Sequence, residues 1–219
     1  MLNLVRTHAP VAIFDFDGTL ADSLDLAIGE YNRLAPRFRV RTLEAHALPR
    51  LRAMKPQAVM KEYGISFLKL PFLVRSMRAA MHAHSEALQP FPSIISTLRD
   101  LSSRGCRCSI LSTNSNQNIE RFLARNDLTL FEHIAGGSSM FGKPRALKRL
   151  IQRAKLDARA VYYIGDEVRD VTAASAAGVR SIAVSWGFAA REALLAHDPD
   201  HVVDRPEQLV PLLTCTAST

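Results

Sequence analysis

Short, largely apolar runs recur along the chain, and each ends at a polar or glycine residue. Runs of this length, bounded in this way, are typical of strands buried on both faces of a sheet. Strands are expected at 11–14, 107–111, 160–164 and 181–184, with weaker candidates at 133–135 and 201–203. Helical spacing of apolar residues lies between them, at 118–125, 144–154, 170–177, 206–213 and between Ser93, an expected helix cap, and Gly105. This alternation predicts an α/β fold with a doubly wound, parallel, Rossmann-like sheet.

The stretch from residue 21 to residue 88 lacks the strand pattern and indicates helices instead. They are expected at 23–34 and 73–84, with a middle part broken at Pro49 and Pro56. The chain is therefore predicted to form a catalytic core from 1–20 and 89–219, with 21–88 inserted as a smaller α-helical cap domain. The hinges are expected at 20–23 and 89–92, and closure of the cap would exclude water and select substrate.

Positive charge is concentrated in the predicted cap. The formal net charge is +7, and residues 32–85 carry eleven Lys and Arg against two acids, so that segment holds +9 and the remainder −2. Such a field attracts small anions or nucleic acid, although a solvated helical surface explains it equally well. The side chains that could contact an anionic leaving group are Arg50, Arg52, Lys55, Arg75, Arg78, His82 and His84.

Composition narrows the class of protein further. Hydrophobic residues make up 47% of the chain and charged residues 22%, which is typical of a globular domain. No run of eighteen apolar residues and no signal-peptide pattern is present, so neither a membrane partner nor secretion is expected. The three cysteines lack metal-ligand spacing and indicate free thiols in a reducing cytoplasm.

Three of the expected strands end in polar clusters that could carry chemistry. The clusters are Asp15 with Asp17, Thr113 with Asn114, and Asp166 with Asp170. Because ligands gather at the carboxyl ends of parallel strands, we expect these residues to share one rim. Asp15 and Asp17 point the same way in extended backbone, and their mutual repulsion favours a cation between them. Oxygen ligands of this kind suit Mg²⁺.

The same residues carry a resemblance to a known family. The segments Phe14–Leu20, Ile110–Asn114, Gly142–Pro144 and Ile164–Asp170 resemble, in order, the four motifs of the haloacid dehalogenase-like hydrolase superfamily. The similarity covers residues 11 to about 213 except the cap. The chain is most similar to the phosphoglycolate phosphatase-like branch, in which a helical cap follows the first motif.

The resemblance implies a phosphatase that acts on a small, anionic phosphorylated metabolite. Asp15 would attack phosphorus and form an aspartyl-phosphate, while Asp17 would act as general acid and then as general base. Thr113 and the backbone amide of Asn114 would bind phosphate oxygens, and Lys143 would neutralise charge on the phosphoryl group.

The resemblance also implies a magnesium site. Mg²⁺ would be held by Asp15, the backbone carbonyl of Asp17 and Asp166. Asp170 would support this set of ligands without binding the ion directly.

Several residues near these motifs keep two interpretations. Ser112 competes with Thr113 for the phosphate-binding hydroxyl, because the two are adjacent at the strand end. Glu167 is a further acid that could support the metal ligands. Trp186 and Phe188, which follow a later strand, are expected to pack in the interior.

Other activities remain alternatives. A sugar phosphomutase shares every core residue named above, and a phosphonate hydrolase would need a cap lysine such as Lys55 or Lys61. A dehalogenase is disfavoured, because that chemistry does not need an acid at Asp17. A nucleic-acid-binding protein has little support beyond the basic charge, since the sequence shows neither a zinc pattern nor an aromatic-rich binding strand. An inactive regulatory protein would not need the complete set of motif residues.

Overall fold

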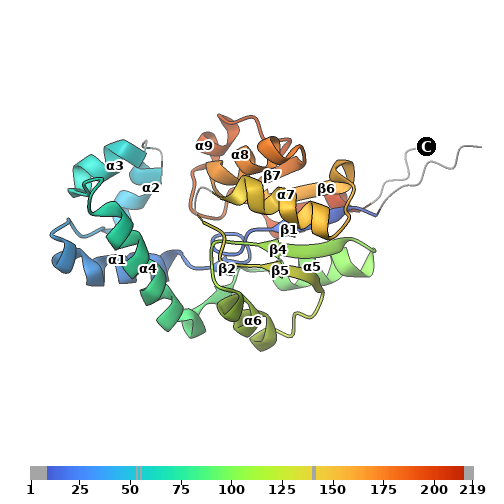
Figure 1. Ribbon diagram of the computed structural model, residues 1–219, viewed down its shortest axis with the longest axis horizontal. Helices are drawn as coiled ribbons and strands as arrows, with labels where there is room; N and C mark the ends of the chain where they lie inside the picture. The colour runs from blue at the N-terminus through green and yellow to red at the C-terminus, as the bar shows by residue number, and fades with distance from the viewer. Residues whose placement is uncertain (1–8, 53, 55, 140–141, 215–219) are drawn as a thin grey trace, which may run out of the picture.

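The computed structural model describes residues 9–52, 54, 56–139 and 142–214, and its centre is a six-stranded parallel sheet (Figure 1). The strand order is β5-β4-β1-β6-β7-β8, so the first strand lies in the middle. The predicted doubly wound α/β fold is confirmed, and all six expected strands form. They are β1 (Val11–Phe14), β4 (Arg107–Leu111), β5 (Phe131–Ala135), β6 (Val161–Gly165), β7 (Arg180–Val184) and β8 (His201–Val203).

Helices cover both faces of this sheet because successive residues of its central strands point to opposite sides. In β1, Ala12 and Phe14 face one apolar cluster, and Val11 and Ile13 face another. The first face is covered by α5 (Ile94–Ser103), α6 (Asn116–Arg125) and, after the short helix η4 (Pro206–Gln208), α10 (Leu209–Leu213). The second face is covered by α7 (Lys143–Arg153), the short helix η3 (Ala158–Ala160), α8 (Val168–Ala177) and α9 (Arg191–Leu195).

The stretch between the first and second strands of the sheet forms a separate group of helices beside the carboxyl ends of the strands (Figure 1). Its members are α1 (Leu24–Phe38), η1 (Ala45–Ala47), α2 (Leu48–Arg52), α3 (Pro56–Tyr63), α4 (Leu70–Ala83) and η2 (Ser85–Ala87). Helices α1 and α4 pack through a small apolar cluster of their own, which contains Leu34, Leu73 and Ala80. We refer to this group below as the cap helices.

The two connections to the cap helices lie side by side. β2 (Ala21–Asp22) pairs with β3 (Gln89–Pro90) in a two-stranded antiparallel sheet. Each strand has only two residues, which is too short to produce a recognisable alternation of polar and apolar positions. The pairing was therefore not visible in the sequence, although both segments fall at the expected hinges.

Two local expectations hold in part. The middle part divides next to both prolines, since η1 ends at Ala47 and α2 begins at Leu48, whereas α3 begins at Pro56. Pro49 itself lies inside α2, at its second position, where the missing backbone N–H is not needed. Ser93 occupies the N-cap position of α5 as expected, but it makes no side-chain cap hydrogen bond, and its φ of 63° is left-handed. Within the described ranges, no helix combines the length and apolarity that crossing a membrane requires.

Candidate functional site

The polar strand ends meet at one rim because their strands are neighbours. Asp15 follows β1, Ser112 follows β4 and Asp166 follows β6, and these three strands lie side by side. Carboxylate oxygens of Asp15, Asp166 and Asp170 all lie within 4.8 Å of one another, and all three residues are buried. Residues separated by about 150 positions in the sequence thus form one acidic cluster.

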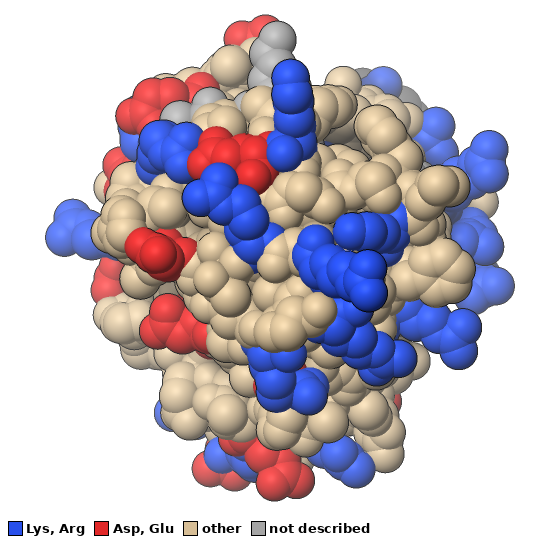
Figure 2. All heavy atoms as spheres, turned by 90° about the vertical axis from the view of Figure 1, so that its left-hand side faces the viewer, with Lys and Arg blue, Asp and Glu red and all other residues tan. Residues whose placement is uncertain are grey.

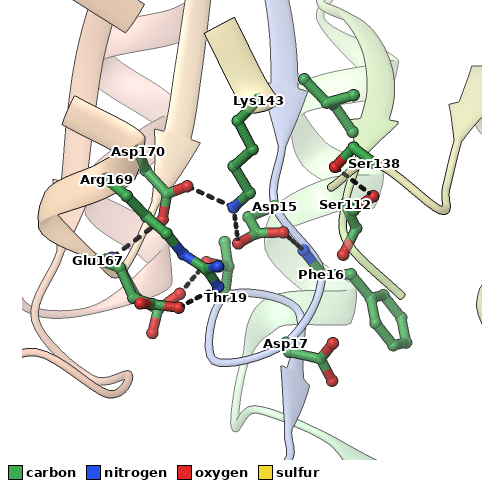
Figure 3. Close-up of polar contacts among 12 residues, drawn as sticks. Asp15, Phe16, Asp17, Thr19, Ser112, Ser138, Lys143, Glu167, Arg169 and Asp170 are labelled. Carbon is green, nitrogen blue, oxygen red and sulfur yellow. Dashed lines mark hydrogen bonds and ion pairs between the residues drawn. The ribbon is translucent and has the colours of Figure 1, made fainter. Parts of the chain in front are cut away.

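Lys143 is the cation at the centre of this cluster (Figure 3). Its Nζ lies 2.5 Å from Oδ2 of Asp15 and 2.5 Å from Oδ1 of Asp170. The other oxygen of Asp15 accepts a hydrogen bond of 2.8 Å from the backbone N–H of Phe16. Burial by itself would lower the pKa of Lys143, but the charges of Asp15 and Asp170 raise it well above its usual value. Lys143 is therefore a fixed positive charge, only 1% exposed.

Asp166 is held by neutral donors instead of a cation. The Thr19 hydroxyl donates to its Oδ1 at 3.0 Å, and the backbone N–H of Phe188 donates to its Oδ2 at 2.7 Å. The residue before Phe188 must be glycine, because a Cβ at Gly187 would lie 2.3 Å from Oδ2 of Asp166 and 2.3 Å from the carbonyl oxygen of Gly18. The loop after β7 thus fixes the orientation of this carboxylate.

The cluster carries more negative charge than Lys143 can neutralise. Burial and the neighbouring charges of Asp170, Glu167 and Asp15 raise the pKa of Asp166 well above its usual value. Burial also raises the pKa of Asp170 to about 6, even though Lys143 opposes the change. Closely spaced buried carboxylates of this kind are stabilised by a cation, and an all-oxygen donor set suits a hard divalent ion. The residues present therefore fit Mg²⁺.

Asp17 lies at the same rim but outside the three-carboxylate cluster. Its Oδ2 accepts a hydrogen bond of 3.0 Å from the side-chain amide of Asn114, whereas its Oδ1 has no partner among the described residues. Burial, followed by the charge of Asp15, raises the pKa of Asp17 to about 6, while Asn114 and the Ser23 hydroxyl lower it. A carboxyl group with such a pKa can both donate and accept a proton near neutral pH.

The end of β4 offers two adjacent hydroxyl groups with different surroundings. Ser112 is fully buried, and its Oγ accepts a hydrogen bond of 3.2 Å from the backbone N–H of Asn114. The carbonyl of Ser112 accepts hydrogen bonds from Ser138, which joins this strand end to the loop after β5. Thr113 is only half-buried. Figure 3 shows Ser112 on the side of Asp15 opposite Asp170.

Three contacts at the rim were not predicted from the sequence. Trp186 packs against Phe91 as expected, with ring centroids 6.4 Å apart, but its Nε1 also donates to the Thr19 carbonyl at 3.1 Å. The contact of Phe188 with Asp166 is made by the backbone, so the residue type gives no signal of it. The third is the contact between Arg169 and Glu167, which is made as the Arg169 side chain extends from α8 toward the site (Figure 3).

Comparison with known proteins identifies the family. The model of the haloacid dehalogenase-like hydrolase family matches residues 12–184. The chain belongs to this family. A phosphoglycolate phosphatase from Synechococcus elongatus is 37% identical over 203 residues, which cover 92% of this chain and 96% of that protein. The recognition based on four ordered motifs is thus confirmed, and this haloacid dehalogenase-like protein is a hydrolase.

Other relatives of this haloacid dehalogenase-like hydrolase are more distant. Pyrophosphatase PpaX from Bacillus mycoides is 24% identical over 214 residues and matches 92% of this chain and 95% of its own length. A solved structure of a haloacid dehalogenase-like family hydrolase from Streptococcus pneumoniae superposes with a TM-score of 0.76 at 24% identity, covering 93% of this chain and 97% of the other. The latter similarity establishes the fold alone.

Proposed function

We propose that this chain is a Mg²⁺-dependent phosphatase that hydrolyses a small phosphorylated metabolite through an aspartyl-phosphate on Asp15. The observation that carries the proposal is the buried Asp15 carboxylate, paired with Lys143 at 2.5 Å and followed by Asp17 at the same rim. The phosphoglycolate phosphatase at 37% identity makes 2-phosphoglycolate the first substrate to test.

Two proton-coupled steps complete the reaction. In the first, an oxygen of Asp15 forms a bond to phosphorus as the bond to the leaving oxygen breaks, and Asp17 gives that oxygen a proton. In the second, Asp17 takes a proton from water, the water oxygen bonds to phosphorus, and Asp15 and inorganic phosphate are released. The pKa of about 6 at Asp17 suits both directions of proton transfer.

The charges around Asp15 favour an incoming phosphate. Asp15, the backbone carbonyl of Asp17 and Asp166 would hold Mg²⁺, which supplies positive charge that offsets repulsion between carboxylate and phosphate. Lys143 would neutralise charge on the phosphoryl group. Both oxygens of Asp170 are engaged, by Lys143 and by the backbone N–H of Glu167 at 3.0 Å, so Asp170 orients the lysine.

The cap helices would select the substrate, with residues 21–88 as the mobile unit and 1–20 with 89–219 as the core. Lys and Arg side chains gather on the face that the cap helices present (Figure 2). Some of these candidates are already paired: Arg50 binds Glu62, and Nδ1 of His84 lies 2.8 Å from Glu30. Arg52 has no hydrogen-bond partner for its buried Nε among the described residues.

Two alternatives from the same family can be tested directly. A phosphonate hydrolase would use a cap lysine, but Lys61 is exposed on α3, and Lys55 lies outside the described residues. A sugar phosphomutase would return the phosphoryl group to a sugar instead of to water. Release of inorganic phosphate in the absence of any sugar distinguishes hydrolysis from that reaction.

The proposal is tested by phosphate release from a panel of phosphorylated metabolites with Mg²⁺ present. We expect turnover of 2-phosphoglycolate and slower turnover of an aryl phosphate, and we expect excess chelator to abolish both and added Mg²⁺ to restore them. Activity that persists fully in chelator would contradict the proposed use of a metal. Absence of turnover across the panel would contradict the phosphatase itself.

A pair of substitutions decides which hydroxyl after β4 binds the phosphate. Thr113→Val is expected to lower kcat/KM by about 10²-fold, the effect of removing one preorganised donor. The matched Ser112→Ala is expected to change kcat/KM much less, because the Ser112 hydroxyl is fully buried and accepts a hydrogen bond from the backbone N–H of Asn114. A larger loss in Ser112→Ala would assign the role to Ser112.

A further inference from the structure

Arg169 is a positively charged residue at the rim, and the proposed phosphoryl-transfer steps give it no role. It is the second residue of α8, between Glu167, which precedes the helix, and Asp170. Its guanidinium group extends toward Thr19 and Asp15 instead of away from the protein (Figure 3). The side chain is 29% exposed, in contrast to the 1% of Lys143.

The hydrogen-bond partners of Arg169 leave part of its guanidinium available. One terminal nitrogen, Nη2, forms an ion pair with Glu167. The Nε atom is buried and has no hydrogen-bond partner among the described residues. Lys143 differs in this respect, because two carboxylates already occupy its ammonium group. Arg169 therefore keeps a donor that no carboxylate occupies, on a side chain that is partly exposed.

The position of Arg169 limits where an anionic partner can lie. The guanidinium group lies on the side of the rim that carries Thr19 and Asp15 (Figure 3). Burial by itself would lower the pKa of Arg169, but the charges of Glu167, Asp170 and Asp15 raise it. An anion that reaches Arg169 must therefore lie near the group that Asp15 attacks. A guanidinium group binds carboxylate and phosphate through two parallel N–H donors, which an ammonium group cannot do.

We propose that Arg169 binds a second anionic group of the substrate, a carboxylate or a further phosphate close to the scissile bond. This assignment rests on the proposed phosphatase function and specifies its substrate class. Esters with an uncharged leaving group of the same size would lack the contact. Arg169 then determines specificity from the core, whereas the sequence placed specificity in the cap alone.

The experiment compares substrates that differ in this group. Initial rates would be measured for 2-phosphoglycolate, for inorganic pyrophosphate and for ethyl phosphate, in which a methyl group replaces the carboxylate. The variants are Arg169→Gln, Arg169→Lys, the cap variant Arg52→Gln and the exposed control Arg153→Gln. The readout is kcat/KM for each anionic substrate divided by kcat/KM for ethyl phosphate.

In Arg169→Gln we expect this ratio to fall by about ten- to hundredfold for at least one anionic substrate, the effect of losing a hydrogen-bonded charge pair. The loss should appear mainly in KM. Arg169→Lys should recover part of it, because the charge remains while the paired donors are lost. Arg153→Gln should leave the ratio unchanged. Whether the 2-phosphoglycolate or the pyrophosphate ratio falls identifies the anion.

Three results would overturn the assignment. If Arg169→Gln leaves the ratio unchanged and hydrolyses the anionic substrates and ethyl phosphate as fast as the wild type does, Arg169 has no role in substrate recognition. The phosphatase function would then remain intact. An equal loss for all substrates places Arg169 on the transferred phosphoryl group. A fall in the ratio for Arg52→Gln alone assigns recognition to the cap. If the wild type hydrolyses none of the substrates, the proposed function fails as well.

Discussion

Asp15→Asn is expected to lower kcat by about 10³-fold or more, because the variant loses the nucleophile but keeps the shape of the side chain. The fold should be unchanged, and the melting temperature should stay close to that of the wild type. Asparagine can still accept the hydrogen bond from Phe16, and Lys143 keeps its ion pair with Asp170 at 2.5 Å. Steady-state phosphate release measures the rate, and thermal unfolding measures the stability.

Trapping of the intermediate gives this prediction a second readout. The substrate carries its label on the phosphoryl group. Acid quenching of the wild type during turnover should leave that label on the protein, whereas Asp15→Asn should show none. Asp127→Asn, an exposed acid after α6, is the matched control and should behave as the wild type. Near-normal turnover in Asp15→Asn, with the fold intact, would rule out the proposed nucleophile.

Lys143→Met is expected to reduce both stability and activity. Removing Lys143 leaves Asp15 and Asp170 buried without their cation, and breaking a buried ion pair in this way costs about 3–5 kcal/mol of unfolding free energy. The variant also loses one electrostatic contact to the phosphoryl group, so kcat/KM should fall by about 10²–10³-fold. Thermal melts and initial rates measure the two effects separately.

The melts of Lys143→Met also test the metal site without reference to activity. Because the variant has lost the cation that pairs with Asp15 and Asp170, Mg²⁺ should raise its melting temperature more than that of the wild type. Lys148→Met, an exposed position on the same helix, is the control and should melt as the wild type. A variant as stable as the wild type in chelator would contradict the role given to the buried lysine.

The core of the fold was readable from the sequence because local pattern and tertiary environment agree there. The central strands are buried on both faces, so their apolar runs are continuous, and each ends where the backbone reaches the polar rim. For β1 and β4 the expected bounds match those in the structure. The strand order was not predicted. The chain crosses from β5, at one edge, to β6, which pairs with β1 and so places Asp15 beside Asp166.

Contacts made by backbone atoms, and contacts set by side-chain reach, could not be read in this way. The two-residue pairing of β2 with β3 has no periodicity to detect. One of the two donors to Asp166 is the backbone N–H of Phe188, which any residue other than proline could provide. The direction of the Arg169 side chain depends on how α8 sits against β6, which the motif around it does not specify.

The sequence alone determined the α/β class, the four ordered motifs and the family, because each depends on residue type and order. Only the tertiary structure decided how charge is distributed among Asp15, Lys143, Asp166 and Asp170, since hydrogen bonding and burial are properties of packed neighbours. It also showed that Ser112 is more deeply buried than Thr113 and that the buried Nε atom of Arg169 has no hydrogen-bond partner among the described residues. Motifs specify which groups react, and packing specifies their geometry and charge.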